Sequence, residues 1–131
     1  MTRPERRRRA ESRGRKAETI AAWWLRLKGY RVLARDFRVP VGEIDLLVQR
    51  GRLLAAVEVK ARQSHRQAAE AIGPRQRQRI ARALGVFLQR RPELAGCDLR
   101  FDALLIVPWR LPRHLVDAWR DDPPLPGRGF G

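Results

Sequence analysis

The stretch Gly42-Glu-Ile-Asp45-Leu-Leu-Val-Gln-Arg-Gly51-Arg-Leu-Leu-Ala-Ala-Val-Glu58-Val-Lys60 consists of two mainly apolar segments on either side of Gly51. Apolar segments of this length, joined at a turn residue, predict a β-hairpin. Charged side chains are unfavourable inside a sheet unless they are paired or bind a metal. The carboxylates and the lysine within these strands therefore indicate a site as well as a fold.

The turn decides which charged residues face one another. With the tip at residues 51–52, as in a type II′ turn, Asp45 lies directly opposite Glu58. With the tip at residues 50–51, Asp45 lies diagonal to Glu58. In both registers Asp45, Glu58 and Lys60 share one face, because strand side chains alternate with a period of two. Directly opposite residues have Cβ atoms roughly 4.5–5.5 Å apart, so that two carboxylates can hold one divalent cation.

Asp45 and Glu58 offer the hard oxygen ligands that suit Mg²⁺ or Mn²⁺, since Mg²⁺ uses few carboxylates and keeps several waters. Such an ion makes water a better nucleophile and neutralises charge that develops on a phosphate. Lys60 would orient the water or stabilise the phosphate. The alternative is a structural ion pair between Lys60 and Glu43, Glu58 or Asp45. The excess of acids over the single lysine favours the metal site.

The composition indicates a polyanionic partner. The 131 residues suffice for one domain, and their net charge of +15 favours binding to nucleic acid or to an anionic membrane. Cys97 is the only cysteine, which excludes a disulfide framework and a cysteine-rich zinc site. The sequence has no apolar stretch of about 20 residues and no secretory h-region, so we expect a cytoplasmic protein without a membrane span.

The remaining chain predicts an α/β domain over residues 14–120, with a mixed sheet covered by helices. In chain order we expect a basic disordered tail (1–13), a helix (14–28), a strand (30–38), the hairpin (42–60), an exposed loop (63–67), a helix (74–91), a strand (100–107), a closing helix (111–120) and an irregular tail rich in Pro and Gly (121–131).

Glu18 lies at the edge of the apolar face of the first predicted helix. One interpretation is a first-turn acid that complements the helix dipole; the other is a further carboxylate of the metal site. The residues alone favour the first. On the second long helix, arginines without interleaved acids predict a phosphate-contacting surface, although a solvated face would look similar. These arginines are Arg75, Arg77, Arg79, Arg82 and Arg90.

Several other reactive or aromatic residues receive no role. His65, His114 and Cys97 lack sequence neighbours typical of a catalytic site. The four tryptophans could stack on nucleobases, but Trp24 and Trp119 lie on apolar faces, which favours packing for these two.

Short motifs along residues 14–120 carry a resemblance to a known family. They are Gly14-x-x-x-Glu18, Gly29-Tyr30, Gly42-Glu-Ile-Asp-Leu-Leu47, Val57-Glu-Val-Lys-Ala-Arg62, Arg79-Ile80 and Arg100-Phe-Asp102. Together they resemble the YraN-like family of small bacterial proteins, in the PD-(D/E)XK nuclease superfamily. The resemblance implies a restriction-endonuclease-like mixed sheet flanked by helices, similar to the core of archaeal Holliday junction resolvases.

The resemblance also implies roles for single residues. Glu18, Asp45 and Glu58 would bind the metal together with the backbone carbonyl of Val59, and Lys60 would assist the water. The resemblance thus favours the second interpretation of Glu18, as a carboxylate of the metal site, over the structural one. Independently of the resemblance, the basic residues predicted to contact nucleic acid are Arg62, Arg75, Arg77, Arg79 and Arg82. The chain departs from the family pattern at Asp36, Ala61 and Gln76, where asparagine, threonine and lysine are usual.

Two functions follow as expectations. The first is a Mg²⁺- or Mn²⁺-dependent endonuclease that hydrolyses phosphodiesters in structured or branched DNA, rather than RNA. The second is a nucleic-acid-binding module without turnover that acts with partners in DNA repair or uptake. A homodimer is a further expectation, because cutting a junction requires two sites. Membrane-surface binding through the arginine-rich tail is disfavoured, since the tail has no apolar face.

Overall fold

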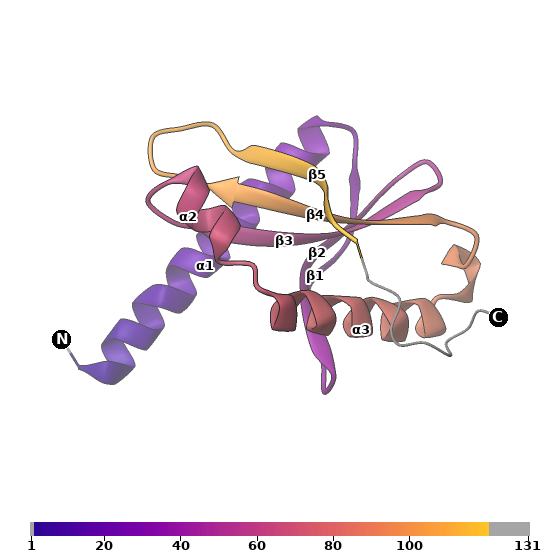
Figure 1. Cartoon of the computed structure of the whole chain (residues 1–131), viewed down its shortest axis with the longest axis horizontal. Helices are drawn as coiled ribbons and strands as arrows, with labels where there is room; N and C mark the ends of the chain where they lie inside the picture. Colours follow the sequence, from indigo (N-terminus) through magenta and orange to yellow (C-terminus); the bar gives the residue numbers. More distant parts are fainter. Residues whose placement is uncertain (1, 121–131) are drawn as a thin grey trace.

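The computed structural model describes residues 2–120, without the side chains of residues 9–13, and has a five-stranded mixed sheet flanked by helices (Figure 1). Its elements are α1 (Arg3–Leu27), β1 (Arg31–Val39), β2 (Gly42–Arg50), β3 (Leu53–Ala61), α2 (His65–Glu70), α3 (Pro74–Arg90), the 3₁₀ turn η1 (Pro92–Leu94), β4 (Asp98–Ile106) and β5 (Arg113–Trp119). The predicted α/β, restriction-endonuclease-like architecture is confirmed. The irregular tail predicted for residues 121–131 lies outside the described residues.

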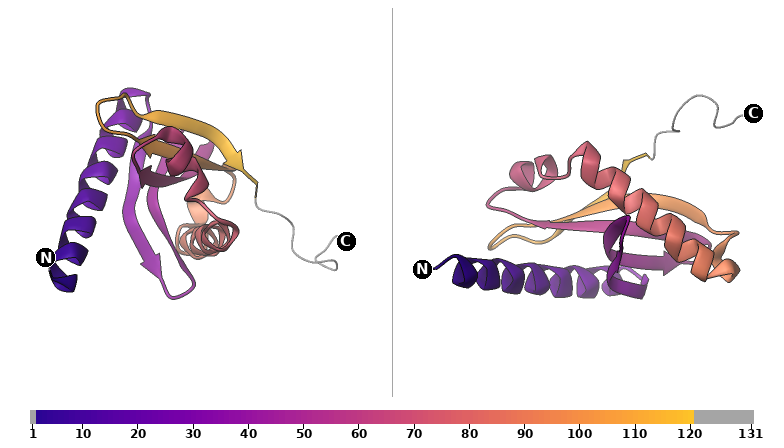
Figure 2. Two further views of the ribbon diagram at one scale, coloured as in Figure 1. Left: turned by 60° about the vertical axis from the view of Figure 1, so that its left-hand side comes forward. Right: turned by 90° about the horizontal axis from the view of Figure 1, so that it is seen from below.

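The strands follow the order β1-β2-β3-β4-β5, with only β3 and β4 parallel. The parallel pair requires a crossover, which α2 and α3 provide on one face of the sheet. The long packed section of α1 covers the other face (Figure 2). On the α1 side, Ala21 and Leu25 pack on Leu46 and Leu104. On the α3 side, the apolar stripe of the helix packs on inward-facing strand residues, among them Ile80, Leu84, Phe87, Ile44, Leu47 and Leu54.

The hairpin register is the first of the two predicted alternatives. Arg50 pairs with Leu53, and the pairing continues to Leu46 and Val57. Gly51 at the tip has φ +60°, the left-handed conformation that the first central position of a II′ turn requires. The turn chemistry read from the sequence therefore positions Asp45 and Glu58 at the same level of the sheet.

The first helix begins at Arg3 and not at residue 14, so the disordered tail expected for residues 1–13 is not what the structure shows over residues 3–13. The Thr2 side chain caps the helix by accepting a hydrogen bond from the Glu5 amide at 3.2 Å, and a proline lies in the first turn. Arginine is also a good helix former. The N-terminal cap and the helix propensity of arginine thus outweigh the repulsion among like charges, which was the reason for predicting a disordered tail.

The closing helix predicted for residues 111–120 is wrong, because this segment forms β5 at the edge of the sheet. Leu115 and Trp119 are four residues apart, a spacing that fits a strand period of two as well as a helix period. The strand pairs Phe101 with Trp119 and Ala103 with Leu115, so a bulge separates the two pairs. Trp119 is buried in the core, as its apolar setting predicted.

The loop expected at residues 63–67 is partly helical. Ser64 caps the short helix α2, and its hydroxyl accepts a hydrogen bond from the Gln67 amide at 3.1 Å. The polar composition of this segment suggested a loop, although Ser64 followed three residues later by Gln67 is a pattern typical of a helix N-terminus.

Gly42 allows α3 to lie directly on β2. A Cβ atom added to Gly42 would come within 1.8 Å of the Arg79 carbonyl oxygen. The two backbones are therefore in contact, and only glycine fits. This close approach brings the N-terminal half of α3, including Gln76, over the end of β3.

A buried charge network joins β4 and β5. The Asp102 carboxylate is fully buried and accepts hydrogen bonds from the Arg100 guanidinium at 2.7 and 2.8 Å, from His114 Nε2 at 2.8 Å and from the Asp117 amide at 2.9 Å. Burial alone would raise the pKa of Asp102, but these hydrogen bonds lower it to about 2. Asp102 thus holds the bulge of β5 in place, and His114 has a structural role.

Candidate metal and nucleic-acid site

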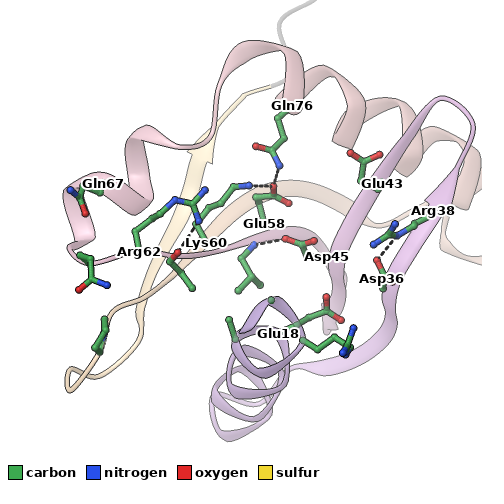
Figure 3. A pocket seen from close by; sticks show the side chains of 17 residues that line it. Glu18, Asp36, Arg38, Glu43, Asp45, Glu58, Lys60, Arg62, Gln67 and Gln76 are labelled. Carbon is green, nitrogen blue, oxygen red and sulfur yellow. Dashed lines mark hydrogen bonds and ion pairs between the residues drawn. The ribbon is translucent and has the colours of Figure 1, made fainter. Parts of the chain in front are cut away.

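A cleft of about 1340 Å³ opens where β2 begins and β3 ends (Figure 3). Its walls come from α1, from the β1–β2 hairpin, from the end of β3 and from the start of α3. The charged and amide side chains that line it are Arg15, Glu18, Asp36, Arg38, Glu43, Asp45, Glu58, Lys60, Arg62, Gln63, Gln67 and Gln76. The cleft therefore gathers all four predicted catalytic residues from three separate parts of the chain.

The position of Asp45 is fixed by a break in the sheet. The β2–β3 pairing ends at Leu46 and Val57. Beyond that pair, the Val59 amide donates to Asp45 Oδ2 at 2.8 Å, in place of a main-chain acceptor. The Asp45 side chain therefore lies between the two strands and is directed at Glu58 by the fold itself.

Glu58 is buried, only 2% exposed, and its Oε2 accepts a hydrogen bond from Gln76 Nε2 and forms an ion pair with Lys60 Nζ at 3.3 Å. Burial, and then the neighbouring charge of Asp45, raise the pKa of Glu58 to about 9, although Lys60 opposes the shift. Only when both carboxylates are ionised, as they would be around a bound cation, do they carry more negative charge than the lysine beside them balances.

Glu18 reaches the same cleft from α1. Its Oε1 lies 3.5 Å from Arg35 Nε. Burial, followed by the charges of Asp45 and Asp36, raises the pKa of Glu18, and Arg35 opposes this. The structure thus brings Glu18 near Asp45, as the family resemblance implied, and gives it a cationic partner that the sequence did not reveal.

The donor set fits a hard divalent cation held by two carboxylates. Asp45 and Glu58 are paired oxygen donors whose proximity raises the pKa of one of them, and a bound cation would relieve that repulsion. Among the side chains that the structure describes, no three from His, Cys, Asp or Glu are grouped closely enough to hold one ion. Glu18 therefore lies at the wall of the cleft, outside that pair. The Val59 carbonyl as a ligand stays a prediction.

The predicted arginine surface divides into different environments. Arg62 lines the cleft, directly beyond Lys60. Arg75 and Arg82 are exposed on α3. The other three α3 arginines contact side chains of the protein: Arg77 lies over the Trp119 ring at 5.6 Å, Arg90 lies over the Phe37 ring at 5.8 Å, and Arg79 forms an ion pair with Glu43 at 2.8 Å.

Some cleft residues escaped the sequence reasoning. Gln76 contacts Glu58 although 18 residues separate them, and no local spacing indicates such a contact. Asp36 and Arg38 form a 2.8 Å ion pair at the rim, where Asp36 has φ +50°. Asp36 is the one acid in a strand whose other charged residues are arginines, and this was the signal that could have identified this part of the rim.

In the part of the chain that the structure describes, no helix is long and apolar enough to cross a membrane.

Comparison with known proteins relates the chain to one family. The profile of the uncharacterised protein family UPF0102 matches residues 17–106. The chain is 56% identical over 117 residues to a UPF0102 protein of Paramagnetospirillum magneticum, covering 86% of this chain and 91% of that protein. It is 61% identical over 107 residues to a UPF0102 protein of Parvibaculum lavamentivorans, covering 82% and 80%. A UPF0102 protein of Maricaulis maris is 49% identical over 113 residues, covering 86% and 89%.

Proposed function

The chain belongs to the uncharacterised protein family UPF0102, as its motifs predicted, and we propose that it is a divalent-metal-dependent endonuclease that hydrolyses phosphodiester bonds in structured or branched DNA. The observation that carries this proposal is the pairing of Asp45 with the buried Glu58 beside Lys60, in an open cleft of a chain with net charge +15. We expect the activity in the cytoplasm, and a homodimer stays a prediction.

The chain's own residues divide the work of such a site. Asp45 is oriented by the Val59 amide, and Glu58 is oriented by Gln76. Lys60 Nζ, which contacts Glu58, is placed to donate a hydrogen bond to a water or to a phosphate oxygen at the same spot. Mg²⁺ or Mn²⁺, held by Asp45 and Glu58, would supply Lewis acidity toward the phosphate and lower the pKa of water.

The N-terminal part of α1 supports nucleic acid as the substrate. This part extends beyond the edge of the sheet (Figure 1), and the next residues, Gly14 and Arg15, line the cleft. We name residues 3–8, with the exposed Arg3, Arg6, Arg7 and Arg8, the arginine arm. A duplex or strand bound at the cleft would pass along this arm.

Replacing the arginines of the arginine arm by neutral residues is expected to weaken DNA binding and to make the binding less dependent on salt concentration. Each phosphate contact contributes about 0.9 to the slope of log K against log salt, so replacing all four arginines by glutamine lowers the slope by up to about 3.6. Fluorescence anisotropy of a labelled duplex across a range of KCl concentrations measures this slope.

A double variant on α3, Arg75→Gln with Arg82→Gln, is the comparison for the arginine arm. Both of its arginines are exposed but do not line the cleft. A slope that is unchanged in the arm variant, with native helix content by circular dichroism, contradicts the role of the arm. A slope that falls in the α3 variant supports the surface predicted from the sequence.

A nucleic-acid-binding module without turnover, acting with partners in DNA repair or uptake, is the second candidate. One observation favours it: Glu58 Oε2 already accepts a hydrogen bond from Gln76 and forms an ion pair with Lys60, so this oxygen has partners without a metal. Such a module would need the basic surface and would bind DNA in the absence of divalent ions.

Cleavage of labelled substrates separates the two functions. The purified protein is incubated in Mg²⁺, in Mn²⁺ and in EDTA with duplex, single-stranded, flap and four-way-junction DNA and with structured RNA. Metal-dependent cutting of the branched substrates supports the endonuclease. Binding without cutting across the whole panel supports the binding module, and preferred cutting of RNA contradicts the assignment to DNA.

A further inference from the structure

The loop between β4 and β5 presents a fully exposed tryptophan at the mouth of the cleft. Trp109 has a relative exposure of 102%, and its neighbour Pro108 lines the cleft. The Arg62 amide donates to the Ile106 carbonyl at 3.1 Å, so the end of β4 lies against the cleft wall formed by the end of β3. Trp109 directly follows Pro108 and therefore lies next to the cleft.

The backbone holds Trp109 in a fixed and unfavourable conformation. The Val107 carbonyl accepts a hydrogen bond from the Arg110 amide at 3.3 Å, and Pro108 occupies the first central position of this turn. Trp109 at the second central position has φ +63°, where a type II turn normally has glycine. A bulky side chain is strained there, and this one gains no burial in return. Folding alone does not account for a tryptophan at this position.

The chemistry around Trp109 matches an anionic, aromatic ligand. The loop sequence from Val107 to Arg113 contains arginines but no acid. Leu111 is 74% exposed, so the tip is apolar as well as basic. Aromatic rings that stack on bases, next to cations that contact phosphates, are the usual means of binding unpaired nucleic acid.

Trp23, the other strongly exposed tryptophan, differs from Trp109 in its position relative to the cleft and in its regular helical backbone. It is 61% exposed on α1, and the Arg26 guanidinium lies 5.2 Å from its ring centroid. Neither Trp23 nor its sequence neighbours Ala22 and Trp24 line the cleft, whereas the neighbour of Trp109, Pro108, does. Exposure alone therefore does not single out Trp109; its position at the cleft mouth and its strained turn do.

We propose that Trp109 stacks on an unpaired or unstacked nucleobase beside the phosphate bound in the cleft. In a continuous duplex each base face is covered by its neighbour, so the ring finds a partner only in single strands, forks and junctions. The loop is thus a specificity element that selects interrupted over continuous duplex. This inference rests on the nucleic-acid binding of the proposed function, and it does not require cleavage.

The test measures binding of the full-length protein in EDTA, so that no cutting intervenes. The dissociation constants are determined for a single-stranded, a forked and a continuous duplex oligonucleotide of equal length. The variant Trp109→Gly removes the ring and suits the positive φ, so the fold is kept. Trp109→Phe restores an aromatic face, and Trp23→Ala is the matched control.

Stacking of one base predicts that Trp109→Gly weakens binding to the single-stranded and forked substrates about tenfold and leaves duplex binding unchanged. Trp109→Phe should recover most of the loss, and Trp23→Ala should bind as the wild type does. A further readout is quenching of tryptophan emission by the single strand, which should be reduced in Trp109→Gly.

The other outcomes overturn the inference in distinguishable ways. If Trp109→Gly binds all substrates like the wild type, the role of Trp109 fails while the proposed function stands. If the loss is equal on duplex and single strand, the ring does not select unstacked bases. If the wild type binds no nucleic acid, both proposals fail. If the variant loses only binding to vesicles of equimolar phosphatidylcholine and phosphatidylglycerol, the tip is a membrane contact.

Discussion

Asp45→Asn is expected to abolish metal-dependent cleavage while the fold and DNA binding persist. The asparagine Oδ1 can still accept the Val59 amide, so the break between β2 and β3 keeps its hydrogen bond. The variant loses the charge that, with Glu58, would hold the cation. Metal ions supply several kcal/mol of charge stabilisation in such reactions, and each 1.36 kcal/mol is tenfold in rate, so we expect a loss on the order of 10³-fold. Cleavage time courses measure it.

The same substitution should not lower stability in metal-free buffer. The charge of Asp45 raises the pKa of Glu58, which means that the two groups repel each other when both are ionised. Removing that charge relieves the repulsion, so the melting temperature is expected to be unchanged or higher. Mn²⁺ should raise the melting temperature of the wild type, because it binds only the folded site, and this rise should vanish in Asp45→Asn.

Lys60→Ala is the matched control for the metal site. Lys60 contacts Glu58 but is a cation and not a ligand, so this variant should lose cleavage and keep the Mn²⁺-dependent rise in melting temperature. Cleavage that survives in Asp45→Asn would indicate a contaminating nuclease or a different active site. A Mn²⁺ response that survives in Asp45→Asn would exclude Asp45 as a ligand.

Asp102→Ala is expected to cause the largest loss of stability. The substitution removes the acceptor of the Arg100 guanidinium, of His114 and of the Asp117 amide in a fully buried setting. Removing one partner of a buried pair usually lowers the free energy of unfolding by about 3–5 kcal/mol, a large part of the total for a small domain. Urea unfolding measures this loss. Asp98→Ala, at an exposed position of the same strand, should change stability by less than about 0.5 kcal/mol.

The pH dependence of unfolding provides an independent check on Asp102. Its pKa is lowered in the folded state, from 3.8 to about 2, so the charged form favours folding. The contribution is complete above the unfolded pKa and is lost as the pH falls from about 4 to about 2; it amounts to about 2 kcal/mol. Asp102→Ala should lack this part of the acid dependence. An unchanged acid profile would show that other carboxylates dominate in this range.

The sequence was most informative where structure depends on near neighbours. The hairpin, and the common face of Asp45, Glu58 and Lys60, follow from Gly51 and the alternation of side chains, although only the structure decided between the two possible registers. The helix α3 follows from a single apolar stripe. These features need only a turn and a period, and both are visible in a window of a few residues.

Contacts between segments that are distant in the sequence could not be predicted from it. Gln76 meets Glu58 only because Gly42 lets α3 touch β2, and Arg79 meets Glu43 for the same reason. The strand β5 was predicted as a helix because a spacing of four residues fits both periods, and only its pairing with β4 decides between them. The extent of α1 depended on a cap at Thr2 that the charge run concealed.

The continuity of α1 has a mechanical consequence. The helix is one rod of 25 residues, about 37 Å long at 1.5 Å per residue. Its first residues, 3–8, are exposed, whereas Ala21 and Leu25 pack on the sheet and form the point about which the helix would tilt. Glu18 lies between this point and the arginine arm, so a tilt of the N-terminal end of the helix would also shift Glu18 in the cleft wall. Under the proposed function, binding of nucleic acid by the arm would therefore be mechanically coupled to the position of Glu18.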